Sequence, residues 1–122
     1  MTDPELLTML ASEAERRSPT IITGVEELAA SGEKDPARIE ELRVEAHGLK
    51  GAALVVGQER LAELAKLIER FLAGCVDSGR INLVSAAAVV TATSAFTEGA
   101  QAAAEGVGEP SSVSDSLNAL SR

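Results

Sequence analysis

The sequence predicts an all-α fold: an antiparallel up-and-down four-helix bundle with an additional N-terminal helix and a flexible C-terminal tail. Two observations support this prediction. Hydrophobic residues make up 45% of the 122 positions but aromatic residues only 2%, so the core must be aliphatic, which favours packed helices over a sheet. Apolar residues also recur at intervals of three and four, the pattern of a helix that buries one face.

Proline marks the start of the first two helical segments. Asp3-Pro4-Glu5 is typical of an N-cap, a first-position proline and an acidic first turn, and it begins a helix that reaches about residue 17. Ser18-Pro19 repeats this signal, and the apolar positions that follow end at Gly32, a plausible helix stop. The two segments are predicted to be either separate helices or one helix kinked at Pro19.

The third and fourth helices form the centre of the predicted bundle. Asp35-Pro36 begins the third helix, and Gly57 separates it from a fourth helix at about residues 58–76. Two long helices joined by such a tight turn must pack antiparallel. The core positions expected from the spacing are Ile39, Leu42, Ala46, Leu49, Ala53 and Val56, then Leu61, Leu64, Ile68, Phe71 and Cys75.

The last predicted helix begins at Asn82, a good N-cap residue, and ends at about Glu105. The residues that follow are rich in Gly, Ser, Glu and Pro, so we expect a mobile tail in which residues 116–120 form at most a transient helical turn. The expected organisation is therefore one helical domain, residues 1–105, and a flexible tail, residues 106–122.

Composition and charge exclude several function classes. The net charge of −8 disfavours binding to nucleic acids and to anionic membranes. Cys75 is the only cysteine, so neither an internal disulfide nor a cysteine metal cluster is expected. There is no signal-peptide pattern, no apolar run of about 18 residues, and no glycine-rich nucleotide loop. A cytoplasmic protein that binds no cofactor or metal of its own is expected.

His47 is the only histidine and lies in the middle of the third predicted helix, away from its apolar stripe. At about 100° per residue, it falls on the flank of the helix, partly or wholly open to water. Arg43, Lys50, Gly51 and Leu54 lie on the same stripe, at −4, +3, +4 and +7 from the histidine. This arrangement suits reversible phosphoryl transfer to a ring nitrogen.

Each neighbour has a physical use if His47 carries a phosphoryl group. Lys50 can offset the phosphoryl charge. Arg43 can do the same from the preceding turn, although pairing with a carboxylate such as Glu40 is the more ordinary role. Gly51 leaves clearance for the phosphoryl group and a partner, at a cost of about 1 kcal/mol relative to alanine in a helix.

Two apolar residues of this helix also fall outside the main seam. Val44 and Leu54, if exposed near His47, would form an apolar docking surface for a partner. Together with Arg43 they are the predicted partner-binding residues.

The segment around the histidine resembles the histidine-containing phosphotransfer family. The family pattern is His-x-Leu-Lys-Gly, then a glycine about six residues later, then Arg-Leu. The resemblance covers residues 39–71 by motif and 4–105 by helix layout. Ala52-Ala53 departs from it, because small hydroxylated residues are frequent there in the family. The matching residues are His47, Leu49, Lys50, Gly51, Gly57, Arg60 and Leu61.

The resemblance implies a phosphorelay intermediate that carries a phosphoryl group on His47 between the aspartates of receiver domains. Its partners would be receiver domains of response regulators, a hybrid histidine kinase, or both, and the receiver would supply Mg²⁺. The chain would be a phosphoryl carrier without its own ATP or substrate site, and so not an enzyme. A closed bundle of this kind is expected to be a monomer.

Two other functions remain open at this point. One is the phosphoacceptor domain of a chemotaxis-type histidine kinase, which an ATP-binding domain would phosphorylate. The other is an adaptor bundle that binds a receiver or kinase through the same face without phosphate chemistry. The reactive ring nitrogen is expected to be the outward Nε2, although the sequence does not assign it.

Overall fold

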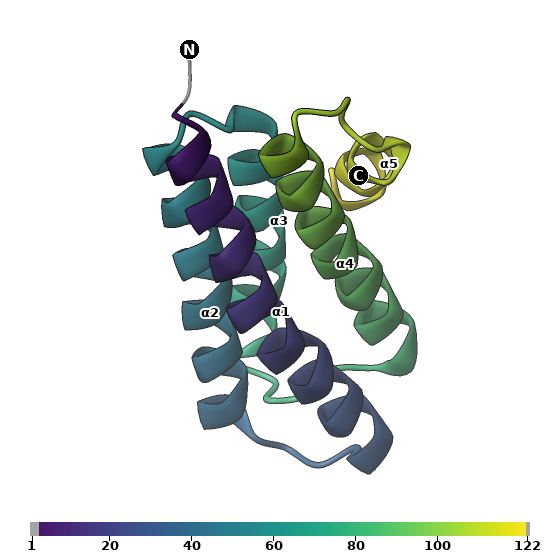
Figure 1. Cartoon of the computed structure of the whole chain (residues 1–122). Helices are drawn as coiled ribbons and strands as arrows, with labels where there is room; N and C mark the ends of the chain where they lie inside the picture. Colours follow the sequence, from purple (N-terminus) through teal and green to yellow (C-terminus); the bar gives the residue numbers. More distant parts are fainter. Residues whose placement is uncertain (1–2, 122) are drawn as a thin grey trace.

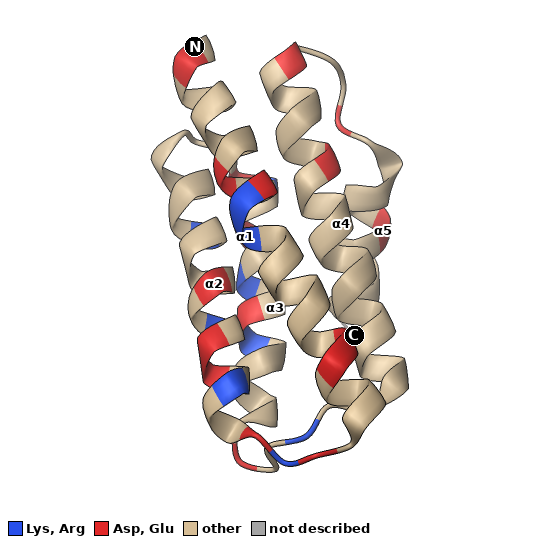
Figure 2. Cartoon of the chain, turned by 60° about the horizontal axis from the view of Figure 1, so that its bottom comes forward, with Lys and Arg blue, Asp and Glu red and all other residues tan. Residues whose placement is uncertain are grey.

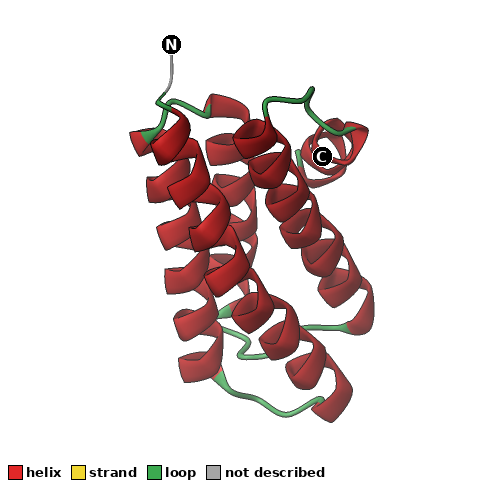
Figure 3. Cartoon of the chain, in the orientation of Figure 1, coloured by secondary structure: helices red, strands yellow, loops and turns green. Residues whose placement is uncertain are grey.

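The fold is a bundle of α-helices joined by short loops, as the computed structural model shows for residues 3–121 (Figure 1). These residues contain no strand (Figure 3), and the all-α prediction is confirmed. Residues 1, 2 and 122, which fall within the two expected segments 1–105 and 106–122, lie outside the described residues. The helices are α1 (Pro4–Ser31), α2 (Pro36–Val55), α3 (Glu59–Cys75), α4 (Leu83–Glu105) and α5 (Ser111–Leu120).

The first four helices form a closed ring. α1 packs against α2 and α4, and α3 packs against α2 and α4. The buried hydrophobic residues between them are aliphatic except for Phe96, which is fully buried. The predicted seam of α2 is confirmed, because Ile39, Leu42, Ala46, Leu49 and Ala53 are all 0% exposed.

Side-chain caps begin three of the helices, at the residues expected from the sequence. The carboxylate of Asp3 accepts a hydrogen bond from the Glu5 backbone N–H at 2.9 Å. Asp35 and Asn82 cap α2 and α4 in the same way, through the N–H groups of residues 38 and 85. These caps satisfy backbone donors that have no partner inside the helix.

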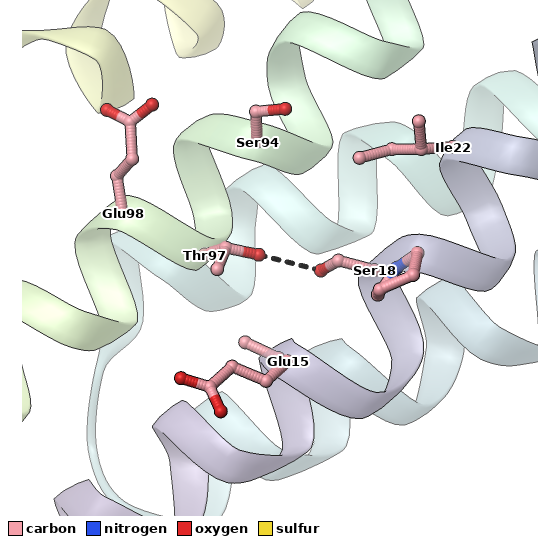
Figure 4. Close-up of a pocket in the computed structure, with 8 residues that line it drawn as sticks. Glu15, Ser18, Ile22, Ser94, Thr97 and Glu98 are labelled. Carbon is pink, nitrogen blue, oxygen red and sulfur yellow. Dashed lines mark hydrogen bonds between the residues drawn. The ribbon is translucent and has the colours of Figure 1, made fainter.

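The two predicted N-terminal segments form the single 28-residue helix α1, which runs through Pro19. Proline inside a helix costs about 3 kcal/mol. The packing of α1 against α2 and α4 offsets this cost, and Thr97 of α4 donates a hydrogen bond to Ser18 at 2.8 Å (Figure 4). A surface hollow of about 380 Å³ lies beside this contact, lined by Pro19, Ile22 and Glu98 among others.

The C-terminal segment differs from the prediction. Residues 111–120 form α5, which packs against α3 and α4, and Val113 is fully buried there. The prediction of a flexible tail is therefore wrong over this helix. The serine-rich composition conceals an apolar stripe at helical spacing, formed by Val113, Leu117 and Leu120.

Two features hold α5 in place. A Cβ atom on Gly99 of α4 would lie only 2.7 Å from Leu61 and 3.0 Å from Val113, so the missing side chain gives α5 its close approach. Arg60 of α3 pairs with Glu109 at 2.9 Å and donates a hydrogen bond to Ser114 at 2.9 Å.

Helix α4 alone, among the residues described, is long and apolar enough to cross a membrane. Of its apolar window, 44% is buried inside the bundle, and a single helix of this kind is weak evidence for a membrane span, because core helices of soluble proteins pass the same test.

Candidate functional site

His47 lies near the middle of α2, and its side chain is 61% exposed. Its neighbour Ala46 and the nearby Leu49 are fully buried, so the register that seals the core turns the histidine outward. The ring is therefore accessible from solvent, as the helical wheel predicted.

The histidine is held by Glu69, a residue of α3 that the sequence analysis did not identify. Nδ1 of His47 lies 2.9 Å from Oε2 of Glu69. Lys50 Nζ lies 2.9 Å from Oε1, and Arg43 Nη1 lies 2.9 Å from Oε2. One carboxylate, only 12% exposed, thus joins three side chains of α2 to α3.

Glu69 is ionised in the folded protein at neutral pH. Burial raises the pKa of its carboxyl group, but hydrogen bonds from Lys50 and His47 outweigh this effect and hold the pKa below its usual value. An ionised carboxylate can only accept hydrogen bonds, so Nδ1 of His47 must carry the proton in this contact. When the ring is neutral, its lone pair is then on Nε2.

Arg43 bridges two carboxylates, and its side chain is 28% exposed. Its Nε lies 2.9–3.0 Å from both carboxylate oxygens of Glu40, and its Nη1 contacts Glu69. The hydrogen bonds that Arg43 donates to Glu40 raise the pKa of Arg43, and the same contact lowers the pKa of Glu40. The pairing with Glu40 that the sequence suggested is present, and Arg43 also contacts Oε2 of Glu69, whereas Lys50 contacts Oε1.

Gly51 has open space beside it. A Cβ atom built at this position would have no other atom within 4 Å, apart from its own helix backbone. Close packing of another helix therefore does not explain this glycine. Gly57, by contrast, has a φ of +74°, a conformation that favours glycine at the turn between α2 and α3.

Apolar side chains are exposed on the same outward side of α2. Val44 and Leu54, the two predicted docking residues, are 49% and 57% exposed. Val55 is 76% exposed, and Met9 of α1, which lines a hollow together with Val55, is 61% exposed. Met9 was not predicted, since its position beside α2 depends on how the two helices pack. Four of the seven large exposed hydrophobic residues in the described part of the chain thus lie on α2 or line the hollow beside it.

Charge is unevenly distributed over the bundle. Figure 2 shows acidic and basic residues along α1, α2 and α3, whereas α4 carries few. Within residues 3–121, no group of three His, Cys, Asp or Glu side chains is placed to hold a metal ion.

The family model of the Hpt domain matches residues 5–106. The chain belongs to the Hpt domain family. Hpt domains are phosphocarrier modules that act in histidine phosphotransfer in two-component signalling and interact with receiver domains. The match covers α1 to α4, whereas α5 lies beyond it. No curated protein matches the chain.

Proposed function

We propose that this Hpt domain is a phosphorelay intermediate that accepts a phosphoryl group on Nε2 of His47 from the aspartyl phosphate of one receiver domain and passes it to the aspartate of another. The observation that carries the proposal is the contact between Nδ1 of His47 and Glu69, because it leaves the solvent-facing nitrogen as the nucleophile. A phosphoryl donor can reach that nitrogen without any movement of the bundle.

The transfer balances without another reactant. The lone pair on Nε2 attacks phosphorus, a P–N bond forms, the P–O bond to the aspartate breaks, and the carboxylate leaves with the electron pair. The ring retains its Nδ1 proton and becomes positively charged. Glu69 stabilises this charge across the 2.9 Å contact, as a buried carboxylate does for a catalytic imidazolium. The reverse reaction restores the neutral ring.

Lys50 is placed to interact with the negative charge that phosphorylation adds. In the resting state, the positive Lys50 and Arg43 are balanced by Glu69 and Glu40. A phosphoryl group adds negative charge one helical turn from Lys50, so the ammonium gains a second partner. A cation and an anion about 5 Å apart at an effective dielectric near 20 attract by roughly 3 kcal/mol, and by less when exposed.

The remaining groups come from the partner. Carboxylates of the receiver bind Mg²⁺, while this chain supplies the nucleophile, the carboxylate that orients it and an apolar docking face. Arg43, Val44, Leu54 and the clearance at Gly51 are the partner-facing elements of that proposal. The protein is then a monomeric, cytoplasmic phosphoryl carrier without an ATP site.

Radiolabelled transfer from a phosphorylated receiver tests the proposal. The expected result is a label on the wild-type protein that is labile in acid and stable in alkali, and that is lost in His47→Gln. Lys66→Gln, which changes an exposed side chain of α3, should be labelled normally. A label that survives His47→Gln removes the proposal.

Two further measurements separate the alternative functions. Labelling by a histidine kinase ATP-binding domain with ATP, but by no receiver, indicates the phosphoacceptor domain of a chemotaxis-type kinase. An adaptor is indicated if wild type and His47→Ala bind a receiver with equal affinity and no phosphate is transferred in either direction.

A further inference from the structure

A hollow of about 280 Å³ lies between α1 and α2, on the side of α2 that faces away from α3. Most of its lining is apolar, and an ion pair between Glu13 and Arg17 closes one end. We call it the α1–α2 hollow. Its lining residues are Leu6, Met9, Leu10, Glu13, Arg17, Gly48, Ala52, Val55 and Val56.

The α1–α2 hollow and the phosphoacceptor border the same outward surface of α2. Successive residues of a helix are rotated by about 100°. His47 therefore leans toward α3, where it contacts Glu69, whereas the next residue, Gly48, faces Arg17 of α1. A domain that covers His47 closely enough for phosphoryl transfer must also cover the surface between these two residues.

Arg17 occupies the space that a side chain at position 48 would need. A Cβ atom on Gly48 would overlap the Arg17 guanidinium at Cζ and Nη1. The guanidinium is held there by Glu13, 2.9 Å from Nε, and by Glu45, 3.4 Å from Nη1. The absence of a side chain at Gly48 thus keeps a half-buried cation beside the hollow.

The apolar side chains at the rim of the hollow are more exposed than apolar side chains usually are. Met9 and Val55 are 61% and 76% exposed, and both line the hollow. A cluster of exposed apolar side chains marks a surface that a partner covers. Methionine is flexible and polarisable, so Met9 can adapt to the shape of an inserted side chain.

We propose that the α1–α2 hollow receives one large apolar side chain of the partner receiver domain, with Arg17 as the polar contact at its edge. This inference rests on the proposed function, because it takes the receiver to be the domain that covers His47. The hollow and Arg17 then help to determine which receivers exchange phosphate with this chain. The chemical step at His47 does not require them.

The test compares two phosphoryl donors. Phosphoramidate labels histidine without docking, whereas an acetyl-phosphate-charged receiver must dock. The measured quantity is the ratio of the receiver-dependent rate, taken as kcat/KM, to the phosphoramidate rate. We expect Met9→Ala/Val55→Ala to lower this ratio at least tenfold, mainly through KM. The matched control, Leu83→Ala/Val84→Ala, truncates two exposed residues of α4 and should stay within twofold of wild type.

A second pair of variants tests Arg17. Gly48→Ala displaces the guanidinium while raising helix propensity, and Arg17→Ala removes it. Both should lower the ratio about fivefold, and the double variant should be no worse than the poorer single variant, because both changes remove the same contact. Gly48→Ala at the wild-type ratio overturns the role of Arg17.

Solution NMR of the wild-type protein tests the same contact without any substitution. The Met9 methyl signal should shift when a receiver is added, while the methyl signals of Leu83 should not. A ratio within twofold of wild type for Met9→Ala/Val55→Ala, or an unmoved Met9 methyl during active transfer, overturns the α1–α2 hollow proposal and leaves the proposed function intact. Both the hollow proposal and the proposed function are overturned if phosphoramidate labels the wild-type protein but no receiver in a panel transfers phosphate to it or from it.

Discussion

Oε2 of Glu69 lies 2.9 Å from Nδ1 of His47, although the two residues belong to different helices. The same carboxylate contacts Lys50 and Arg43. An ionised acceptor on the inner nitrogen places the proton there and leaves the outer nitrogen as the nucleophile. The packing of α3 on α2 therefore orients the reactive group of α2.

Glu69→Gln should loosen this orientation, because an amide can donate or accept at the same distance and no longer requires a proton on Nδ1. We expect the fraction of the Nδ1–H tautomer, measured by ¹⁵N NMR, to fall. The transfer rate should fall by about tenfold or more, comparable to the loss when a metal-bound histidine loses its orienting partner. Glu63→Gln, an exposed residue of the same helix, is the control. An unchanged tautomer and rate would contradict this role.

Acid should weaken the fold partly through Glu69. The pKa of this carboxyl group is lower in the folded protein than in the unfolded chain, so the unfolded chain takes up its proton first as the pH falls. Its contribution to stability is complete above the unfolded value, near 4.3, and is lost as the pH falls through the folded value. Urea unfolding between neutral pH and about pH 3 should show a shallower loss for Glu69→Gln. The same slope for both proteins is the contrary result.

Gly51→Ala should separate stability from function. The position is helical and open, so alanine should raise the free energy of unfolding by about 1 kcal/mol. Transfer from a receiver should nevertheless slow, because the added methyl group occupies the clearance beside His47. Gly74→Ala, at another open helical glycine, should leave the transfer rate unchanged. If transfer by Gly51→Ala equals that of wild type, the clearance has no role.

Val113→Ala should show that α5 is part of the folded unit. Val113 is 0% exposed against α3 and α4, so its truncation should lower the free energy of unfolding by about 2 kcal/mol. Val107→Ala removes the same atoms from a residue that is 58% exposed and should change stability little. Chemical denaturation of both variants measures the difference, and equal stability would show that α5 is detached in solution.

The helices of the bundle follow from local signals. Asp3, Asp35 and Asn82 form the expected caps, and the apolar spacing of α2 matches its buried residues. The continuity of α1 through Pro19 is less local, because contacts with two other helices offset the cost of the proline.

The contact between Glu69 and His47 could not be predicted from local sequence signals. The outward position of His47 depends on one helix, and its sequence neighbours are on that helix too. The contact with Glu69 depends on the rotation and axial offset of α3 against α2, which no residue spacing within one helix determines. A glutamate next to the buried Ile68 was the available signal, but α3 carries other glutamates as well.

Helix α5 was missed for a compositional reason. Its serines and the preceding glycines are typical of mobile segments, yet the three apolar residues Val113, Leu117 and Leu120 suffice because Gly99 provides a place for them on α4. That place exists only after α3 and α4 have packed.

The most direct test is to locate the phosphoryl group after transfer from a phosphorylated receiver. Correlation of ³¹P with the ring protons and nitrogens in the phosphorylated wild-type protein reports the bonded atom. We expect one phosphoryl group on Nε2 of His47, with the proton still on Nδ1 beside Glu69. A phosphoryl group on Nδ1 or on another residue would contradict it.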